Sequence, residues 1–388
     1  MGIGHTTGHS GRRRDVGEDS RDVAREAWGG GVRILIRATN WVGDAIMALP
    51  ALRVVRAKFP DAHIAILARP YVADIYRGQG VCDELIPYDP RGAEKGFGGR
   101  ERLAERLRAG KFDVALLLQN AFDAAWLAWR AGIPERIGYA RDGRGILLTN
   151  SILVPKAGEI PAHEQFYYLE LVRRAGWAER NEGSSEILLA VSREASDAAE
   201  RKLIEAGAGV RSGANGAGAL RVAIGAGASY GSAKCWLPER FADVANRLMA
   251  ESGAEIILFG TANETAVSNA IVAGMQRKPI DLTGKTPIAE LPALLSRCQL
   301  FIGNDSGAMH VASAAGLPVV AIFGPTDPFG TAPVTPKCTI VQDKPYCSPC
   351  FLRRCPTDHR CMTRVSSETV TAAARAWLAG TSTEVHPA

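Results

Sequence analysis

The chain has 388 residues and a formal net charge of +5, with 46% hydrophobic and 7% aromatic residues. A chain of this length is longer than one that ordinarily folds around a single hydrophobic core, so two domains are expected. The modest charge gives no reason to expect a nucleic-acid partner. No apolar run reaches the ~18 residues of a membrane-spanning helix, and residues 1–30 lack the apolar stretch of a secretory signal. We therefore expect a cytoplasmic protein, with residues 1–30 as a disordered lead-in.

Short apolar, β-branched runs alternate with helical patterns along the first half of the chain. Strands are predicted at residues 32–38, 63–69, 85–88 and 113–118, with 135–140 and 146–152 as strands or connections. Helices are predicted at residues 45–58, 71–78, 101–110, 122–132 and 163–176. Pro50 lies early in the first of these helices, so we expect it to delay the helix start or to bend its first turn.

A second α/β series begins after a polar, aperiodic stretch at residues 177–186. Strands are predicted at residues 221–227, 254–260, 279–284, 300–305 and 319–324, the last of these being the last clear strand. Helices are predicted at residues 193–207, 237–253, 262–275, 287–298, 306–316 and 366–380. We expect domains at 31–182 and 183–365, followed by a terminal helix and tail at 366–388. Two parallel, Rossmann-like sheets facing each other would place a ligand cleft at the carboxyl ends of their strands.

The sequence NDSGAMH (304–310) follows a predicted strand and opens a predicted helix. Asp305 or Ser306 is placed as an N-cap, and capping alone is one interpretation. The alternative is a diphosphate site, because Gly307 allows close approach of a ligand, helix N-termini bind phosphate, and His310 can point to the same place. A serine hydrolase is disfavoured, since GxSxG is absent and triad partners converge from distant segments.

Asp44 follows the first predicted strand, in a loop that delivers it to the carboxyl edge of the sheet. It is either an N-cap or a general base that activates an acceptor hydroxyl. The Gly-rich loop after residues 221–227 carries Ser229, Tyr230 and Lys234 and suits a diphosphate, although it does not match a P-loop.

Two more strand-end loops offer groups for a nucleoside. Glu264 is a candidate for ribose hydroxyls, or else simply a first-turn glutamate favoured by the helix dipole. Thr283 and Gly284 end a neighbouring strand in the same predicted sheet and are candidates for the nucleoside.

Four cysteines lie within fifteen residues, at Cys347, Cys350, Cys355 and Cys361, with His359 between the last two. In a reducing compartment this spacing suggests a structural metal site, with zinc or an iron–sulfur cluster as the candidates. Free or redox-active thiols and disulfides remain the alternatives. The spacing does not match a common zinc ribbon.

Taken together, these segments resemble the ADP-heptose:lipopolysaccharide heptosyltransferases of glycosyltransferase family 9. The resemblance covers residues 32–380 and rests on three motifs in order, NWVGDAIMALPALR, GASYGSAKCWLPERFA and NDSGAMHVASAAGLPVVAIFGPTDP. The cysteine-rich CSPCFLRRCPTDHRCM is similar to that of type II members. The resemblance implies a two-domain GT-B fold with the acceptor in the N-terminal domain and ADP-heptose in the C-terminal domain.

The resemblance also implies roles for individual residues. Asp44 would be the base that deprotonates the acceptor hydroxyl, and no cofactor would be required for this inverting transfer. Donor-binding residues would be Ser229, Tyr230, Lys234, Glu264, Thr283, Gly284, Asp305, Ser306, Gly307 and His310.

The implied acceptor is a lipid-anchored sugar core, heptosyl-Kdo-lipid A, on the cytoplasmic face of the inner membrane, where the protein would bind peripherally. Candidate acceptor contacts are Asn40, Trp41, His163 and Gln165, with basic residues such as Arg37, Arg69 and Arg141. Other readings remain open: heptosyltransferase I, a transferase using another nucleotide sugar such as a UDP-sugar, a nucleotide-binding module without turnover, or an α/β hydrolase.

Overall fold

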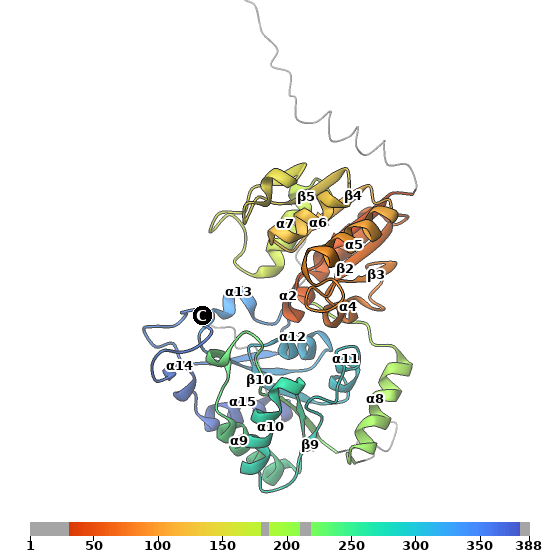
Figure 1. Ribbon diagram of the computed structural model, residues 1–388. Coiled ribbons are helices and arrows are strands. Elements are labelled where there is room, and N and C mark those ends of the chain that lie inside the picture. The colour runs from red at the N-terminus through yellow and green to blue at the C-terminus, as the bar shows by residue number, and fades with distance from the viewer. Residues whose placement is uncertain (1–30, 180–185, 210–218, 381–388) are drawn as a thin grey trace, which may run out of the picture.

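The computed structural model describes residues 31–179, 186–209 and 219–380. We call residues 31–179 the N-terminal lobe and the remaining described residues the C-terminal lobe; Figure 1 shows one above the other. The expected lead-in at residues 1–30 and the expected boundary between residues 182 and 183 lie outside the described residues. The division into domains therefore stays a prediction.

Each lobe is built on a parallel sheet covered by helices, as predicted. In the described residues the first sheet has the strand order β3-β2-β1-β4-β5-β6 and every neighbouring pair is parallel. Its strands are β1 (Arg33–Arg37), β2 (His63–Ala68), β3 (Glu84–Pro87), β4 (Val114–Leu117), β5 (Glu135–Tyr139) and β6 (Asn150–Ile152).

The second sheet has the order β12-β11-β10-β7-β8-β9 and is also parallel. Its strands are β7 (Arg221–Gly225), β8 (Glu255–Phe259), β9 (Ile280–Asp281), β10 (Leu300–Asn304), β11 (Val319–Phe323) and β12 (Cys338–Gln342). Both sheets have the strand order of the Rossmann fold. In this order the chain adds strands toward one edge from the first strand, and then toward the other edge from the fourth strand, which lies beside the first. Ligands bind where the order reverses, at the carboxyl ends of the strands. The switch points are therefore β1/β4 and β7/β10.

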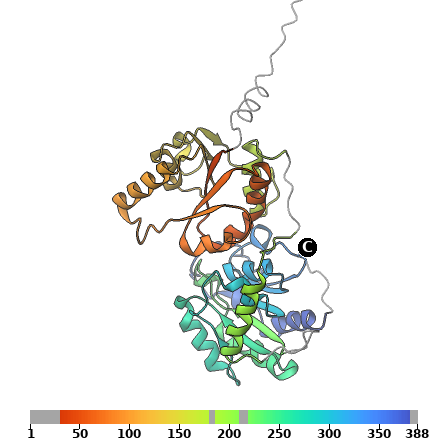
Figure 2. The same ribbon diagram turned by 90° about the vertical axis from the view of Figure 1, so that its right-hand side faces the viewer.

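Helices cover both faces of the sheets, which explains why the central strands are apolar without alternation (Figures 1 and 2). In the N-terminal lobe they are α2 (Val42–Met47), α3 (Leu49–Lys58), α4 (Pro70–Tyr76), α5 (Gly96–Ala109), α6 (Phe122–Arg130), α7 (Glu164–Arg174) and the 3-10 turn η1 (Arg144–Leu147). In the C-terminal lobe they are α8 (Arg193–Glu205), α9 (Pro238–Ser252), α10 (Thr265–Gly274), α11 (Leu291–Leu295), α12 (Gly307–Ala314), α13 (Pro328–Thr331), α14 (Arg360–Thr363), α15 (Ser367–Leu378) and the 3-10 turns η2 (Ser232–Lys234) and η3 (Ala262–Glu264).

The predicted helix at residues 45–58 is two helices. Pro50 occupies one of the first two positions of α3, and α2 ends before it at Met47. Proline is tolerated in a first turn but cannot continue a helix through its interior. The helix therefore restarts at Leu49, and α2 is left as a short separate element that begins at Val42, earlier than predicted.

The prediction that the last clear strand ends at residue 324 missed β12. This strand lies at the edge of the second sheet, and of its residues only Val341 is buried. A half-exposed edge strand carries a weak apolar signal, which is why the sequence pattern did not reveal it.

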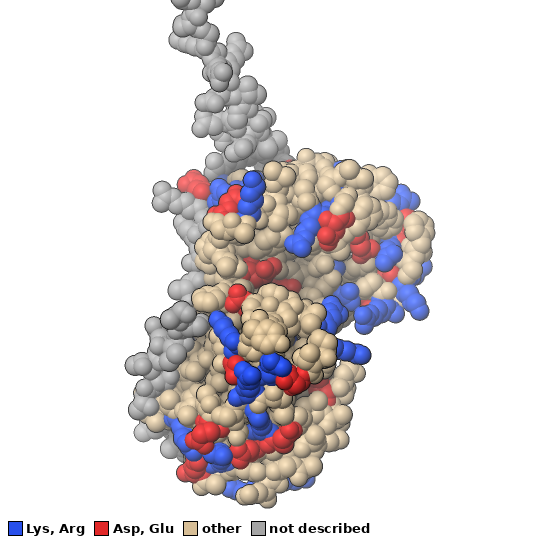
Figure 3. All heavy atoms as spheres, turned by 90° about the vertical axis from the view of Figure 1, so that its left-hand side faces the viewer, with Lys and Arg blue, Asp and Glu red and all other residues tan. Residues whose placement is uncertain are grey.

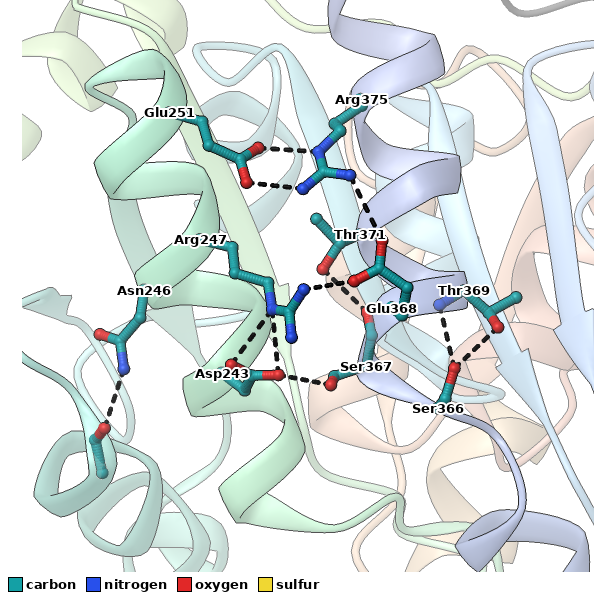
Figure 4. Close-up of polar contacts among 11 residues, drawn as sticks. Asp243, Asn246, Arg247, Glu251, Ser366, Ser367, Glu368, Thr369, Thr371 and Arg375 are labelled. Atoms are coloured by element: carbon teal, nitrogen blue, oxygen red, sulfur yellow. Dashed lines mark hydrogen bonds and ion pairs between the residues drawn. The ribbon is translucent and has the colours of Figure 1, made fainter.

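The terminal helix α15 is held against α9 by a network of ion pairs (Figure 4). Arg247 and Arg375 both pair with Glu368, and Arg375 also forms a bidentate pair with Glu251 (2.6 and 2.7 Å). Beneath the network, Val370 and Ala374 are buried in the same core cluster as α9. The terminal helix predicted at residues 366–380 is thus part of the C-terminal lobe.

Candidate active site

The two lobes meet where α2 packs directly against α12 (Figure 1). A Cβ atom on Gly43 would lie 2.8 Å from Cδ2 of His310, and one on Gly307 would lie 3.0 Å from Cβ of Val42. Only glycine permits the first of these approaches without displacement of the neighbouring ring. The contact brings Asp44 and the Asp305–His310 turn together at the groove between the lobes, in which Figure 3 shows acidic atoms.

Asp44 is the third residue of α2 and not its N-cap, which is Trp41. The capping interpretation of Asp44 is therefore wrong. Burial and, to a smaller extent, the negative charge of Glu164 together raise the pKa of its carboxyl to about 7, and the positive charge of Lys234 opposes both effects. A carboxyl with a pKa near neutrality is suited to accept a proton at physiological pH.

Glu164 is a functional candidate that the sequence did not single out. It lies in the first turn of α7, where burial raises the pKa of its carboxyl while a hydrogen bond from Tyr168 and the charge of Arg141 lower it. Its position next to His163, which was singled out, is the one sequence signal available. Its effect on Asp44 arises from tertiary structure.

Lys234, from the loop after β7, meets Asp305, from the end of β10. The Lys234 ammonium donates to Oδ2 of Asp305 at 2.5 Å, and the Thr326 hydroxyl donates to the same oxygen at 2.6 Å. Lys234 also lies 4.9 Å from the ring centroid of Tyr230. These residues come from both sides of the β7/β10 switch point, as the Rossmann topology requires for a ligand site.

Ser306 is the N-cap of α12, one of the two positions predicted, but its side chain makes no capping hydrogen bond. Its hydroxyl is buried and has no hydrogen-bond partner among the described residues. The first-turn N–H groups of α12 have no carbonyl acceptors within the helix and favour an anion. Capping alone thus leaves this hydroxyl unexplained, and an anionic ligand would satisfy it.

His310 is buried one turn into α12. Burial lowers the pKa of its imidazole to about 4, with Asp305 opposing the shift and His163 and Lys234 adding to it. The ring is therefore neutral at physiological pH. Its edge faces Gly43 of the other lobe.

Glu264, Thr283 and Gly284 come together at the ends of β8 and β9. Glu264 lies in a first turn, as its structural interpretation predicted, and it also accepts the Thr261 backbone N–H at 2.6 Å in a capping box that was not predicted. Its carboxylate also occupies the space beside Gly227 and, with Thr283, lines a pocket whose floor is apolar. Sequence reasoning missed Ser268, whose buried hydroxyl lines the same pocket and has no partner among the described residues.

The candidate acceptor residues differ in exposure and in their hydrogen-bond partners. Trp41 is exposed, and Asn40 accepts a hydrogen bond from Arg37 (2.9 Å). His163 accepts the Gln165 backbone N–H at Nδ1 (3.2 Å) and donates from Nε2 to the Ala332 carbonyl of the other lobe (2.8 Å). Both nitrogens of His163 are therefore engaged.

Arginines that were candidate acceptor contacts differ in exposure. Arg37 is buried and lies 5.2 Å from the ring centroid of Tyr88, and burial lowers its pKa to about 10. Arg141 is exposed.

The metal site expected at the cysteines is not supported. All four are free thiols; Cys347 is exposed and Cys361 is buried. In the parts of the chain that the structure describes, no three His, Cys, Asp or Glu side chains form a group that could hold a metal ion. The Nε2 of His359 instead donates to the Ala233 carbonyl at 2.7 Å.

Comparison with known proteins identifies the family of this site. Residues 100–360 match the family model of glycosyltransferase family 9 (heptosyltransferase). The chain is 29% identical over 326 residues to lipopolysaccharide heptosyltransferase 2 of Salmonella typhimurium, which covers 80% of this chain and 88% of that protein. It is 28% identical over 324 residues to the protein of the same name from Escherichia coli, with the same coverage.

Solved structures share the fold. The structure of E. coli ADP-heptose LPS heptosyltransferase II superposes with a TM-score of 0.73 at 25% identity and covers 90% of this chain and 99% of that one. A family 9 glycosyltransferase from Veillonella parvula gives a TM-score of 0.76 at 24% identity, over 90% of this chain and 98% of that one. The two Rossmann-like lobes facing a groove are the GT-B arrangement that was predicted. The chain therefore belongs to glycosyltransferase family 9, the heptosyltransferases, and is a glycosyltransferase.

Proposed function

We propose that this enzyme transfers L-glycero-D-manno-heptose from ADP-heptose to the heptosyl-Kdo-lipid A core of lipopolysaccharide, the reaction of heptosyltransferase II. The relatives named above support the donor and the acceptor class. The observation that carries the proposal is that the carboxyl of Asp44, whose pKa is near 7, lies at the same lobe contact as the N-terminal turn of α12, whose unpaired Ser306 hydroxyl suits an anion. These are the two groups that an inverting sugar transfer needs.

In the proposed reaction, the Asp44 carboxylate takes the proton of an acceptor hydroxyl. The hydroxyl oxygen attacks the anomeric carbon of heptose from the face opposite the diphosphate, so the new C–O bond inverts the anomeric configuration. The bond between that carbon and the diphosphate oxygen breaks, and the electron pair leaves with ADP. Lys234, the Ser306 hydroxyl and the N-terminus of α12 would stabilise the departing diphosphate.

The nucleoside of the donor would bind beside Glu264 and Thr283, which line a small hollow at the ends of β8 and β9. Glu264 would accept from ribose hydroxyls while keeping its capping bond. The nucleoside would then lie at the carboxyl ends of β7 to β9, and the diphosphate would lie beside it at β10.

The acceptor would enter from the N-terminal lobe, near Trp41. Within the described residues, no helix is both long enough and apolar enough to cross a membrane. A lipid-anchored acceptor would thus be met at the surface of the inner membrane, on its cytoplasmic face, by a peripherally bound enzyme.

The test replaces Asp44 by asparagine, which is nearly isosteric and cannot take the proton. Transfer of heptose from ADP-heptose should fall by about a hundredfold to ten-thousandfold, while the affinity for ADP stays near that of the wild type. Near-normal transfer by this variant would refute the base assignment. Acceptors carrying no heptose or one heptose distinguish the first from the second heptosyl transfer, and use of the acceptor without heptose alone would refute the type II assignment.

A further inference from the structure

The cysteine-rich segment, residues 347–361, has no part in the reaction proposed above, yet it is built onto the donor-binding loop at residues 229–234. The Tyr230 hydroxyl donates to the Phe351 carbonyl at 2.6 Å, and the Ala233 N–H donates to the Arg353 carbonyl at 3.1 Å. His359 closes the contact by donating to the Ala233 carbonyl. Three hydrogen bonds thus join two segments more than a hundred residues apart.

The packing between the two segments leaves no room for a side chain at Gly231. A Cβ there would lie 2.3 Å from the Arg353 carbonyl oxygen. On its other side, the segment donates the N–H groups of Cys350 and Phe351 to the Pro325 carbonyl (3.0 and 2.8 Å). Pro325 precedes Thr326, which binds Asp305. The cysteine-rich segment therefore contacts the loop that carries Lys234 and also the loop whose Thr326 donates to Asp305.

Arg353 brings a positive charge to this place. Its guanidinium carbon lies 5.3 Å from the ring centroid of Tyr230, the same ring that Lys234 approaches at 4.9 Å. Lys234 is buried and already paired with Asp305. Arg353 is exposed, and no ion pair of its guanidinium occurs among the described residues.

The charge balance of the site calls for such a cation. A bound nucleoside diphosphate brings roughly two to three negative charges, and preorganised cations are what stabilise a departing phosphate. The carboxylate of Asp305 already compensates Lys234, so that lysine alone cannot neutralise the ligand. Arginine also fits phosphate oxygens through paired N–H donors, which lysine lacks.

We propose that Arg353 is a second diphosphate-binding residue, and that the cysteine-rich segment serves to hold it, through backbone contacts, beside Tyr230 and Lys234. The inference deepens the proposed function, since it rests on an ADP-sugar as the donor. It assigns the segment a role that requires no metal: its backbone carries the contacts to the donor loop.

The test compares Arg353→Gln, Arg353→Lys and the matched control Arg354→Gln, the last removing the same charge from the neighbouring exposed position. Binding of ADP and of adenosine to the full-length protein is measured by calorimetry, together with KM for ADP-heptose. Arg353→Gln should weaken ADP binding and raise KM about tenfold or more, and leave adenosine binding unchanged because adenosine has no phosphate. Arg353→Lys should recover part of the loss, and Arg354→Gln should behave as the wild type.

Equal ADP affinities for the wild type and Arg353→Gln would overturn the assignment while leaving the proposed function intact. A parallel loss of ADP and adenosine binding, with a lowered melting temperature, would also overturn it, because Arg353 would then act only in loop structure. Absence of ADP binding to the wild type would refute the donor class itself, and with it both proposals.

Discussion

Glu164 gives a direct test of how the site sets the basicity of Asp44. Burial is the largest cause of the raised pKa of Asp44, and the negative charge of Glu164 is the next. Replacing Glu164 by glutamine keeps the shape of the side chain and removes its charge. Ionisation of Asp44 then becomes easier, so the pKa of Asp44 should fall while remaining above its ordinary value.

The size of the effect follows from the pKa of about 7. A rise from 3.8 to about 7 corresponds to about 4 kcal/mol opposing ionisation of Asp44. If ionised Asp44 is required, about one tenth of the wild-type molecules are active at pH 6, and activity falls about tenfold for each further pH unit. Glu164→Gln can therefore raise the activity at pH 6, relative to the plateau above pH 8, by at most about tenfold; we expect about threefold, since burial remains.

The assay is the pH profile of kcat/KM for heptose transfer between pH 5 and 9, because this ratio reports groups of the free enzyme. Glu205→Gln is the matched control: it removes the same charge from an exposed position on α8. An acidic limb that stays in place in Glu164→Gln, or moves to higher pH, would refute the electrostatic coupling. An equal displacement in both variants would show an effect of net charge alone.

Three other perturbations test the structure. Asp44→Asn should stabilise the fold at pH 8 by up to about 4 kcal/mol, because a carboxyl whose folded pKa lies above its unfolded pKa destabilises the native state at pH values above the unfolded pKa. This gain should vanish near pH 4, where the carboxyl is protonated in both states. Denaturant unfolding that shows no gain at pH 8 would contradict the burial of this charge. Gly43→Ala should lower kcat at least about tenfold by pressing on His310 across the lobe contact, and wild-type kcat would show that the contact can relax. Glu368→Ala should lower the melting temperature by a few degrees in dilute buffer and by less in 0.5 M salt, since both arginines that it joins are solvent-accessible; a loss independent of salt would indicate packing instead.

The sequence pattern was sufficient for the two parallel sheets apart from the edge strand β12, because buried parallel strands are continuous apolar runs and most of them were followed by a helical pattern. It also located the loops that bear Asp44, Lys234 and Asp305, since strand ends in such sheets share one edge. The break at Pro50 was anticipated only as a delay or bend. Whether a proline bends a helix or divides it depends on the packing on either side.

The features of the site that could not be predicted from the sequence depend on contacts between residues far apart in the chain. Glu164 influences Asp44 from a helix that follows all six strands of the first sheet, and no spacing rule connects the two. The spacing of the cysteines suggested a metal because close thiols commonly bind one, yet their segment contacts the donor loop through backbone groups. Propensity and motif reasoning describe local chemistry, and these relations are created by the fold.

The close approach of α2 and α12 at Gly43 and Gly307 has a mechanical consequence. Because the backbone of α2 touches a side chain of α12 at this point, any rotation of one lobe against the other would pivot near it. Displacement grows with distance from a fulcrum, so such a rotation would open the outer groove widely while the spacing between Asp44 and the N-terminus of α12 changes least. If Asp44 and the turn on α12 act as proposed, such a rotation would widen the groove for an acceptor without separating these two groups.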